Sequence, residues 1–406
     1  MRILIVGAGG VGSAAALIAA RRGFFESIVL ADYEAERARA VVGRLSDPRF
    51  TAAQVDASDA AAITALCAEH AVTHVLNVVD PRFVMPIFTG AFEAGADYLD
   101  TAMSLSHPHP ERPYELPGVK LGDDQFAMHD QWEQAGRLAL IGMGVEPGLA
   151  DVFARYARDE LFSEIHEIGV RDASNLEVEG YDFAPSFSIW TTIEECLNPP
   201  LIWDSERGFH TTEPFSEPEV FDFPEGIGPV ECVNVEHEEV VLIPRVIDAQ
   251  RVTFKFGLGQ HFIDVLQTLH RLGLDSTDPV DVHGQRVSPR DVVAAVLPDP
   301  ATLGDRMTGR TCAGTWITGL GKDGLPREVY LYHVADNGWT MREHGTQAVV
   351  WQTAMNPVIA LELLSDDTWS GSGVRGPESF DARAFLDLLR DGYGQAWVVE
   401  ERTPSS

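Results

Sequence analysis

A glycine-rich run near the N-terminus has the spacing of a nucleotide-binding turn. It lies between a short apolar segment and an alanine-rich segment and consists of Gly7, Ala8, Gly9, Gly10, Val11 and Gly12. In such a turn the first glycine permits the bend, the second admits a pyrophosphate to the backbone, and the third lets a helix pack on a strand. N–H groups at the helix N-terminus attract the phosphates. The run therefore predicts a dinucleotide site, the alternative being a strand–helix turn that binds no nucleotide.

An acidic residue at the end of the next strand-like segment indicates which dinucleotide binds. Asp32 follows the run by about twenty residues, the separation at which a carboxylate accepts hydrogen bonds from the adenosine ribose. A 2′-phosphate would meet a like charge there, which favours NAD over NADP, although Arg37 or Arg39 offers a phosphate an alternative partner. Further candidates to line the cofactor are residues that ordinary strand-end loops also contain: Asp56, Val79 and Asp80.

Two side chains are candidates for proton transfer, which needs a group whose pKa lies near the working pH. His237 is the first, because the flanking Glu236 and Glu238 can orient its ring and raise its pKa. The alternative is a structural histidine at an acidic strand edge. Glu146 is the second, since it lies in a strand–helix turn of the kind at which open α/β sheets build sites. The alternative is a carboxylate that interacts with the helix dipole.

Candidate substrate-binding residues lie in the middle of the chain. Arg171 and Arg245 adjoin strand-like segments, and arginine binds a carboxylate through two parallel hydrogen bonds, although structural pairing is the alternative. Trp190 offers an apolar wall to a methylene chain, or else packs in the core. His107 and His109 have no nearby cysteine or spaced carboxylate, so we expect no metal site.

The elements that must position these residues begin with a regular alternation in the first 160 residues. Strand-like apolar runs occupy 3–6, 28–31, 52–55, 75–79, 98–100 and 138–142. Helical patterns occupy 12–22, 34–45, 60–70 and 83–94. This alternation predicts a doubly wound parallel sheet of Rossmann type, with helices on both faces.

The pattern changes from about residue 165 onward. Strand-like runs at 165–171, 239–244, 251–256, 311–320 and 328–334 are separated by loops rich in proline, glycine and acids. Helical patterns occupy 260–272 and 288–296, and again 346–364 and 381–391 in the tail. We therefore predict a second domain of α+β type, followed by helices that cap it or return to the first domain.

The composition of the chain limits the classes of binding partner that we expect. The 406 residues exceed one ordinary core, and a net charge of −32 repels phosphate backbones and anionic lipid, so we expect neither nucleic-acid nor membrane partners. No apolar run approaches the roughly 18 residues that cross a bilayer. The cysteines (Cys67, Cys196, Cys232 and Cys312) are far apart, which favours a reducing cytoplasm over a disulfide framework.

Beyond the glycine-rich run, the chain resembles the saccharopine dehydrogenase family. The resemblance is carried by Asn77–Pro81 (NVVDP), Gly95–Ala102 (GADYLDTA), Gly142–Leu149 (GMGVEPGL) and Gly373–Glu378 (GVRGPE). It implies a Rossmann domain at 1–150 completed by 345–406, with a substrate and dimerisation domain inserted at 151–344, and it implies a homodimer.

The same resemblance implies an enzyme that transfers a hydride between NAD and the carbon of a C–N bond in an amino acid or a secondary amine derived from one. The segments from 170–175 and 181–190 depart from the saccharopine reductase pattern. Lysine 6-dehydrogenase-like and carboxynorspermidine dehydrogenase-like activities are therefore alternatives, as is a non-catalytic NAD sensor. The stretch 235–239 is similar to the polyamine-type members and keeps a polyamine-type substrate open beside an amino acid.

Overall fold

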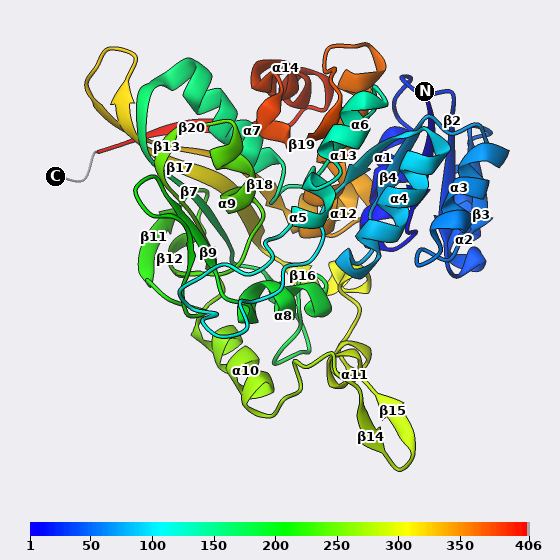
Figure 1. Ribbon diagram of the computed structural model, residues 1–406, viewed down its shortest axis with the longest axis horizontal. Helices are drawn as coiled ribbons and strands as arrows, with labels where there is room; N and C mark the ends of the chain where they lie inside the picture. The colour runs from blue at the N-terminus through cyan, green and yellow to red at the C-terminus, as the bar shows by residue number, and fades with distance from the viewer. Residues whose placement is uncertain (404–406) are drawn as a thin grey trace.

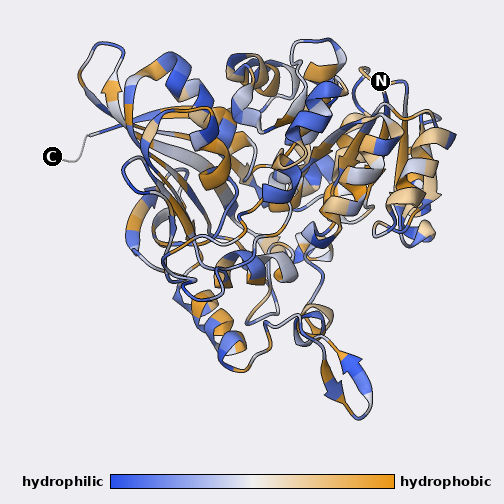
Figure 2. Ribbon diagram, in the orientation of Figure 1, coloured by the Kyte–Doolittle hydropathy of each residue, from blue (hydrophilic) through white to orange (hydrophobic). Residues whose placement is uncertain are grey.

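The computed structural model describes residues 1–403 and has two lobes, each built on its own sheet (Figure 1). The first lobe holds a parallel sheet in the order β19-β6-β5-β4-β1-β2-β3. Its strands are β1 (Arg2–Val6), β2 (Ser27–Asp32), β3 (Phe50–Gln54), β4 (His74–Asn77), β5 (Asp97–Asp100), β6 (Leu138–Leu140) and β19 (Gly373–Arg375). The strands are almost continuously apolar because helices cover both faces of the sheet (Figure 2).

The helices of the first lobe follow the strands in the predicted alternation. They are α1 (Gly10–Ala19), α2 (Ala35–Leu45), α3 (Ala60–Glu69), α4 (Val84–Ala94), α5 (Asp123–Phe126) and α6 (His129–Gln134). A helix from the tail, α13 (Ala348–Ser365), packs against α1. The N-terminus of α1 and the carboxyl ends of β1, β4, β5 and β6 therefore face the second lobe (Figure 1).

The second lobe holds a mixed sheet in the order β10-β9-β13-β7-β17-β18-β20, with β12 pairing to β13 and β11 to β12. Its strands are β7 (Phe162–Ser174), β9 (Leu201–Asp204), β10 (Gly208–Thr211), β11 (Glu219–Phe223), β12 (Gly228–Asn234), β13 (Ala249–Gly257), β17 (Arg310–Gly321), β18 (Pro326–Asp336) and β20 (Val398–Arg402). Two small sheets pair β8 (Glu177–Val178) with β16 (Met307–Thr308) and β14 (Val280–Val282) with β15 (Gln285–Val287). The remaining helices are α7 (Leu149–Tyr156), α8 (Ile189–Leu197), α9 (Glu239–Leu242), α10 (Gln260–Arg271), α11 (Pro289–Val296), α12 (Asn337–His344) and α14 (Ala382–Asp387).

This architecture confirms the predicted fold class, a Rossmann parallel sheet joined to an α+β domain with its own sheet. The C-terminal tail differs in one respect from the predicted domain organisation. The domain prediction assigned all of 345–406 to the first domain, and β19 does extend the parallel sheet, but β20 pairs with β18 at the edge of the mixed sheet.

The predicted strand at 239–244 is wrong. These residues form α9 and the start of a 3₁₀ turn over Ile243–Arg245. Residues 239–243 are all buried, so the apolar run reflects burial on every side, which a short helix and a strand share.

The two lobes are held together by one continuous cluster of buried apolar side chains. It runs from strands of the parallel sheet through α7 and α13 into β7, β13 and β17 of the mixed sheet. Within residues 1–403, no helix is long and apolar enough to cross a membrane. The shared core fixes the edge of one sheet against the face of the other, and the candidate site lies between them.

Candidate active site

The glycine-rich turn has the geometry that a dinucleotide requires. A Cβ at Gly12 would lie 1.8 Å from the carbonyl oxygen of Gly7, so this contact between α1 and the turn demands glycine. Gly7 has a φ of +107°, and a Cβ there would lie 2.6 Å from Val79. A Cβ at Gly9, by contrast, would meet no atom within 4 Å. The open space beside Gly9, at the N-terminus of α1, fits a pyrophosphate.

Asp32 is the last residue of β2, and its side chain is hydrogen-bonded to the same turn. Its Oδ2 accepts a hydrogen bond from the backbone N–H of Ala8 at 2.8 Å, and its Oδ1 accepts one from Glu34 at 2.9 Å. The guanidinium of Arg37 lies 3.7 Å from Oδ1 and also pairs with Glu34, while Arg39 pairs with Glu36. Arg37 and Arg39 are thus both paired with carboxylates.

The other predicted cofactor-lining residues follow strands of the same sheet edge. Asp56 is exposed and accepts hydrogen bonds from the backbone and hydroxyl of Ser58, which shapes the turn before α3. Val79 packs against Gly7. Asp80 caps the turn before α4 and pairs with Arg82 at 2.9 Å. The structure thus brings Val79 to the glycine-rich turn, whereas the carboxylates of Asp56 and Asp80 are engaged locally.

His237 lies in the short segment that connects β12 to α9, at the interface of the two lobes. The end of β12 pairs with β13, and His237 stacks flat on Phe254 of β13, with ring centroids 3.8 Å apart. The backbone N–H of Glu236 donates to the carbonyl of Glu195 on α8, and the N–H of Met103, just after β5, donates to the carboxylate of Glu238. These contacts place a nearly fully buried imidazole beside the carboxyl edge of the parallel sheet.

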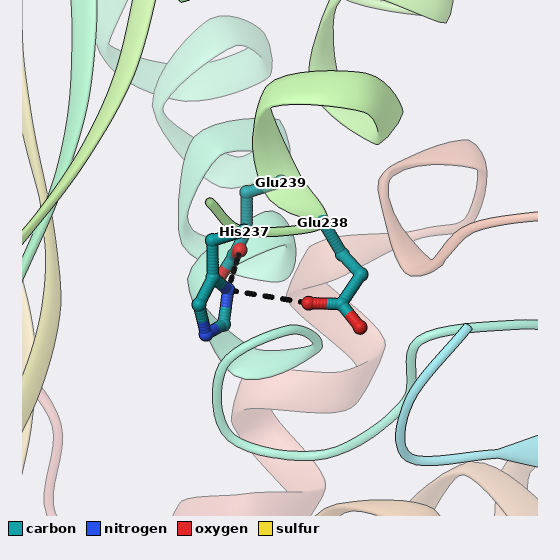
Figure 3. Close-up of side chains that lie close together, drawn as sticks. All are labelled: His237, Glu238 and Glu239. Atoms are coloured by element: carbon teal, nitrogen blue, oxygen red, sulfur yellow. Dashed lines mark hydrogen bonds and ion pairs between the residues drawn. The ribbon is translucent and has the colours of Figure 1, made fainter. Parts of the chain in front are cut away.

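Carboxylates surround the Nδ1 atom of His237 (Figure 3). Nδ1 lies 2.5 Å from Oε2 of Glu239 and 3.4 Å from Oε2 of Glu238, and the Nε2 atom points away from both (Figure 3). Burial lowers the pKa of His237, but the Glu239 carboxylate, assisted by Glu238 and Glu195, raises it to about 10. The ring is therefore an imidazolium near neutral pH, with Nδ1 donating to Glu239.

Further carboxyl groups face the same ring. Glu146, in the turn after β6, is hydrogen-bonded to Asp172 of β7, so that a carboxyl from each lobe meets at this point. Burial raises the pKa of Glu146 well above its usual range, and the neighbouring Asp172 and Glu239 raise it further. Burial also raises the pKa of Asp172 to about 6 and that of Glu195 to about 8. Glu146 therefore carries the proton that it shares with Asp172.

Arg171 lies on the opposite face of the mixed sheet from this cluster. Its guanidinium is buried, donates to Glu219 at 2.5 Å and donates to the hydroxyl of Thr253 at 3.1 Å. Because side chains alternate along β7, Asp172 points to the His237 side and Arg171 away from it. The structure thus places Arg171 in a structural ion pair, away from the position predicted for it as a substrate ligand.

The other two predicted substrate residues are also held outside the His237 cluster. Two guanidiniums lie over the ring of Trp190, that of Arg82 at 4.3 Å and that of Arg290 at 4.7 Å. Arg245 stacks on Phe126, with its guanidinium carbon 3.4 Å from the ring centre. Trp190 therefore joins the two lobes through cation–π contacts, and Arg245 joins the 3₁₀ turn after α9 to α5.

His237, Glu238 and Glu239 also form the one group within residues 1–403 whose atoms would suit a metal ion, all lying within 4.8 Å of one another. The Nδ1 atom is directed at both carboxylates as a charged donor, so the contacts are those of an ion pair. His107 and His109 contribute to no such group: the backbone of His107 bridges to Val119, and the ring of His109 accepts from Glu111 and Arg112.

Sequence reasoning missed most of the acidic groups that surround His237. Asp172 and Glu195 were not among the candidates, and Glu239 was assigned to a strand edge. One signal was available, because Glu239 opens an apolar run that continues through Val240 to Ile243. An acidic residue that begins an apolar run is buried only where it has a charged partner, and His237 is two residues away.

Comparison with known proteins covers both lobes. The model of the saccharopine dehydrogenase NADP binding domain matches residues 3–140, and that of the saccharopine dehydrogenase C-terminal domain matches residues 144–394. A carboxynorspermidine synthase of Vibrio alginolyticus is 31% identical over 100% of this chain and 98% of its own. A carboxyaminopropylagmatine dehydrogenase of Synechocystis is 29% identical over 98% of this chain and 96% of its own.

The fold agrees with these matches. Apo saccharopine dehydrogenase (L-Glu forming) from Saccharomyces cerevisiae superposes with a TM-score of 0.70 over 99% of this chain and 100% of its own, at 14% identity. The family models together span both lobes and include the glycine-rich turn and the His237 segment. The chain belongs to the saccharopine dehydrogenase family of nicotinamide-dependent oxidoreductases that act on carbon–nitrogen bonds.

Proposed function

We propose that this enzyme interconverts an imine and a secondary amine formed between an amino-acid-derived aldehyde and a cationic, polyamine-type amine, with NAD as the cofactor. The bound nicotinamide supplies or accepts the hydride. The observation that carries the proposal is the excess of carboxyl groups around His237, at the edge of the sheet where Rossmann domains hold their ligands.

The charge of this cluster favours a cationic substrate. The neighbouring carboxyls raise the pKa values of Glu146, Glu195 and Glu238. His237 is the cation that lowers the pKa values of Asp172, Glu195 and Glu238. Removing so many carboxyls from water is unfavourable unless a positive charge enters. An ammonium or guanidinium group provides that charge, whereas a substrate that presented only carboxylates would be repelled.

The same geometry supports a proton donor. Reduction of an imine adds a hydride to carbon and a proton to nitrogen, and the imidazolium of His237 can donate that proton from Nε2. Glu239 holds the opposite nitrogen at 2.5 Å and stabilises the charged ring before the transfer. We predicted His237 as a base, and its raised pKa makes it an acid in the resting enzyme, which favours the direction of imine reduction.

The named relatives agree with this substrate class. Carboxynorspermidine and carboxyaminopropylagmatine, which appear in the names of the relatives, are amines that bear a carboxyl group. Both a cationic end and a carboxylate end are then present in the substrate. The carboxyl cluster around His237 would bind the cationic portion, and the carboxylate of the substrate would lie away from it.

NAD rather than NADP is supported by the surroundings of Asp32. Asp32 ends β2, where Rossmann domains carry the acidic residue that binds the ribose 2′-hydroxyl, and Arg37 and Arg39 are paired with carboxylates. A 2′-phosphate would have to displace these pairs and tolerate Asp32. The family model carries the name of an NADP binding domain, so both cofactors belong in the assay.

The test is absorbance at the reduced-nicotinamide band with purified protein. Carboxynorspermidine, carboxyaminopropylagmatine, saccharopine and lysine would each be offered with NAD and, separately, with NADP, and the reverse reaction with diamines and a carboxylated aldehyde. Turnover with a polyamine-type amine and not with saccharopine or lysine is expected. Turnover confined to saccharopine or lysine would refute the assignment. The homodimer and the cytoplasmic location stay predictions, the first open to size-exclusion chromatography.

A further inference from the structure

His237 belongs to no helix or strand, so contacts of its side chain must fix its ring. It lies in the segment 235–238, which connects β12 to α9. The contact between Nδ1 and Oε2 of Glu239, at 2.5 Å, fixes one atom of the ring. Rotation of the ring about that contact would still move Nε2, the atom that donates the proton in the proposed reaction. A second contact is therefore needed to fix the plane of the ring.

Phe254 of β13 fixes that plane. Its ring lies parallel to the ring of His237, with an angle of 4° between the planes and 3.8 Å between the centroids. Phe254 is 1% exposed, and its backbone pairs with Val170 of β7 in the interior of the mixed sheet. Because β13 is held by strands on both sides, the phenyl ring is a rigid surface on which the imidazole lies.

The geometry of this stack is that of a cation on an aromatic face. Two neutral aromatic rings avoid a face-to-face sandwich and prefer offset or edge contacts, with centroids about 4.5–7 Å apart. Phe254 meets its neutral neighbour Phe256 in this way, edge-on at 6.4 Å. A positively charged ring is instead attracted to the negative face of a phenyl ring, and the attraction is strongest where water is excluded. Since both rings of the stack are buried, the close parallel contact favours the imidazolium over the neutral imidazole.

We propose that Phe254 is a positioning residue that stabilises the charged form of His237 through its π face and sets the direction of Nε2. The contact with Glu239 and the stack on Phe254 act on different parts of the ring and together define its place. The step that they serve is transfer of the Nε2 proton to the imine nitrogen as a hydride reaches the imine carbon. That step rests on the proposed function, whereas the effect of Phe254 on the protonation of His237 does not.

The charged groups near the ring come from other elements or from the other face of the sheet, so a substitution at residue 254 leaves them in place. Lys255, the next residue of β13, points to the opposite face and pairs with Glu219 at 2.7 Å. The titratable groups that act on His237 are acids: Glu238 and Glu239 at the start of α9, Glu195 of α8, Asp172 of β7 and Asp151 of α7. A change in the pKa of His237 on altering the ring of Phe254 therefore reports the contact between the two rings.

A fluorinated series tests the π face with little change in packing. Replacing Phe254 by mono-, di- and pentafluorinated phenylalanine withdraws electron density from the face of the ring and leaves its shape almost unchanged. We expect the pKa of His237 to fall from about 10 in steps along the series, by about 0.5–1.5 pH units in total. NMR titration of histidine-labelled protein measures this pKa without substrate, and the signal of His237 is identified by its loss in His237→Gln.

Phe254→Leu tests the positioning of Nε2. Leucine fills much of the space but has no flat face, so the ring of His237 can turn about its contact with Glu239. We expect a similar fall in the pKa of His237. In addition, kcat should be about tenfold or more below the wild type at a pH of about 6, where the ring is charged in every variant. The fluorinated enzymes keep a flat ring and should retain the wild-type kcat at that pH.

Phe223→Leu is the matched control, because Phe223 is a buried phenylalanine of the same lobe that packs edge-on against Tyr330. It should lower the melting temperature to a similar extent and leave the pKa of His237 unchanged. A pKa of His237 that does not respond to fluorination would overturn the proposal, and so would wild-type kcat in Phe254→Leu at a pH of about 6. If Phe254→Leu does not fold, the fluorinated series still decides the question. The expected pKa shifts without turnover on any amine would uphold the contact and count against the proposed substrate instead.

Discussion

The prediction that bears most directly on the site concerns Glu239→Gln. Glu239 is the largest influence that raises the pKa of His237, from an ordinary value of about 6.5 to about 10. A rise of that size corresponds to roughly 5 kcal/mol of preference for the imidazolium form. Glutamine has nearly the same shape and still offers an oxygen to Nδ1, but it carries no charge. Glu238 and Glu195 remain, so the pKa of His237 should fall by part of this rise.

The sign of the effect on activity follows from the protonation state. Imine reduction needs the imidazolium, so the wild-type rate should hold until the pH approaches about 10 and fall beyond it. In Glu239→Gln the fall should begin near neutral pH. With a pKa of about 7.5 in the variant, only about one tenth of the rings are charged at a pH of about 8.5, which predicts a loss of about tenfold there. Near a pH of about 6 the two enzymes should differ little in protonation.

The assay is the initial rate of NADH consumption across this pH range with saturating amine and aldehyde. Glu231→Gln, at an exposed position of β12, removes an equal charge away from the ring and should keep the wild-type profile. The reasoning is refuted if the alkaline limb of Glu239→Gln stays near pH 10, because His237 would then not owe its proton to Glu239. A loss of equal size at every pH would point to altered geometry and not to altered charge.

Three other predictions test separate parts of the molecule. Asp32→Ala should raise the ratio of NADP to NAD kcat/KM about tenfold or more, because a like charge no longer faces the 2′-phosphate, and steady-state kinetics with both cofactors checks this. Arg171→Met should lower the free energy of unfolding by about 2–3 kcal/mol in urea titrations and leave KM unchanged, since a buried partner of the half-exposed Glu219 is lost. Because burial raises the pKa of Glu195 to about 8, binding of a cationic amine near neutral pH should release protons, which calorimetry in buffers of different ionisation enthalpy detects. Calorimetric heats that do not depend on the buffer would contradict this last expectation.

The first lobe could be predicted from the sequence because its signals are local. The central strands β1, β2 and β4 are buried almost throughout and stand out in the sequence as short apolar runs, and the glycine-rich turn lies between the first strand and the first helix. In the second lobe, apolar runs likewise predicted the long central strands β7, β13, β17 and β18. It missed β9 to β12, which are short and lie toward one edge, where burial is less regular and loops of several lengths intervene.

The site itself depends on information that a single sequence does not carry. The alternation of β7 was sufficient to say that Arg171 and Asp172 face opposite sides, but not which side meets the other lobe. Arg171, predicted as a substrate ligand, lies on the face that contacts Glu219, away from His237. His237 was a candidate because its acidic neighbours are adjacent in the chain. Asp172 and Glu195 come near it only through the pairing of β13 with β7 and the packing of α8.

The carboxyl groups around His237 come from distant parts of the chain, and burying them together lowers the stability of the fold while preparing the site for a positive charge. Each of Glu146, Asp172, Glu195 and Glu239 comes from a different element, so the cluster exists only when the lobes are packed together. The shared apolar core supplies the free energy that holds these acids in place despite their mutual repulsion. Under the proposed function, the cationic amine supplies the positive charge that this cluster lacks, and the repulsion among the carboxyls falls when it binds. The proposed affinity for a cationic amine and the repulsion among the carboxyls of the empty enzyme are then two consequences of the same arrangement.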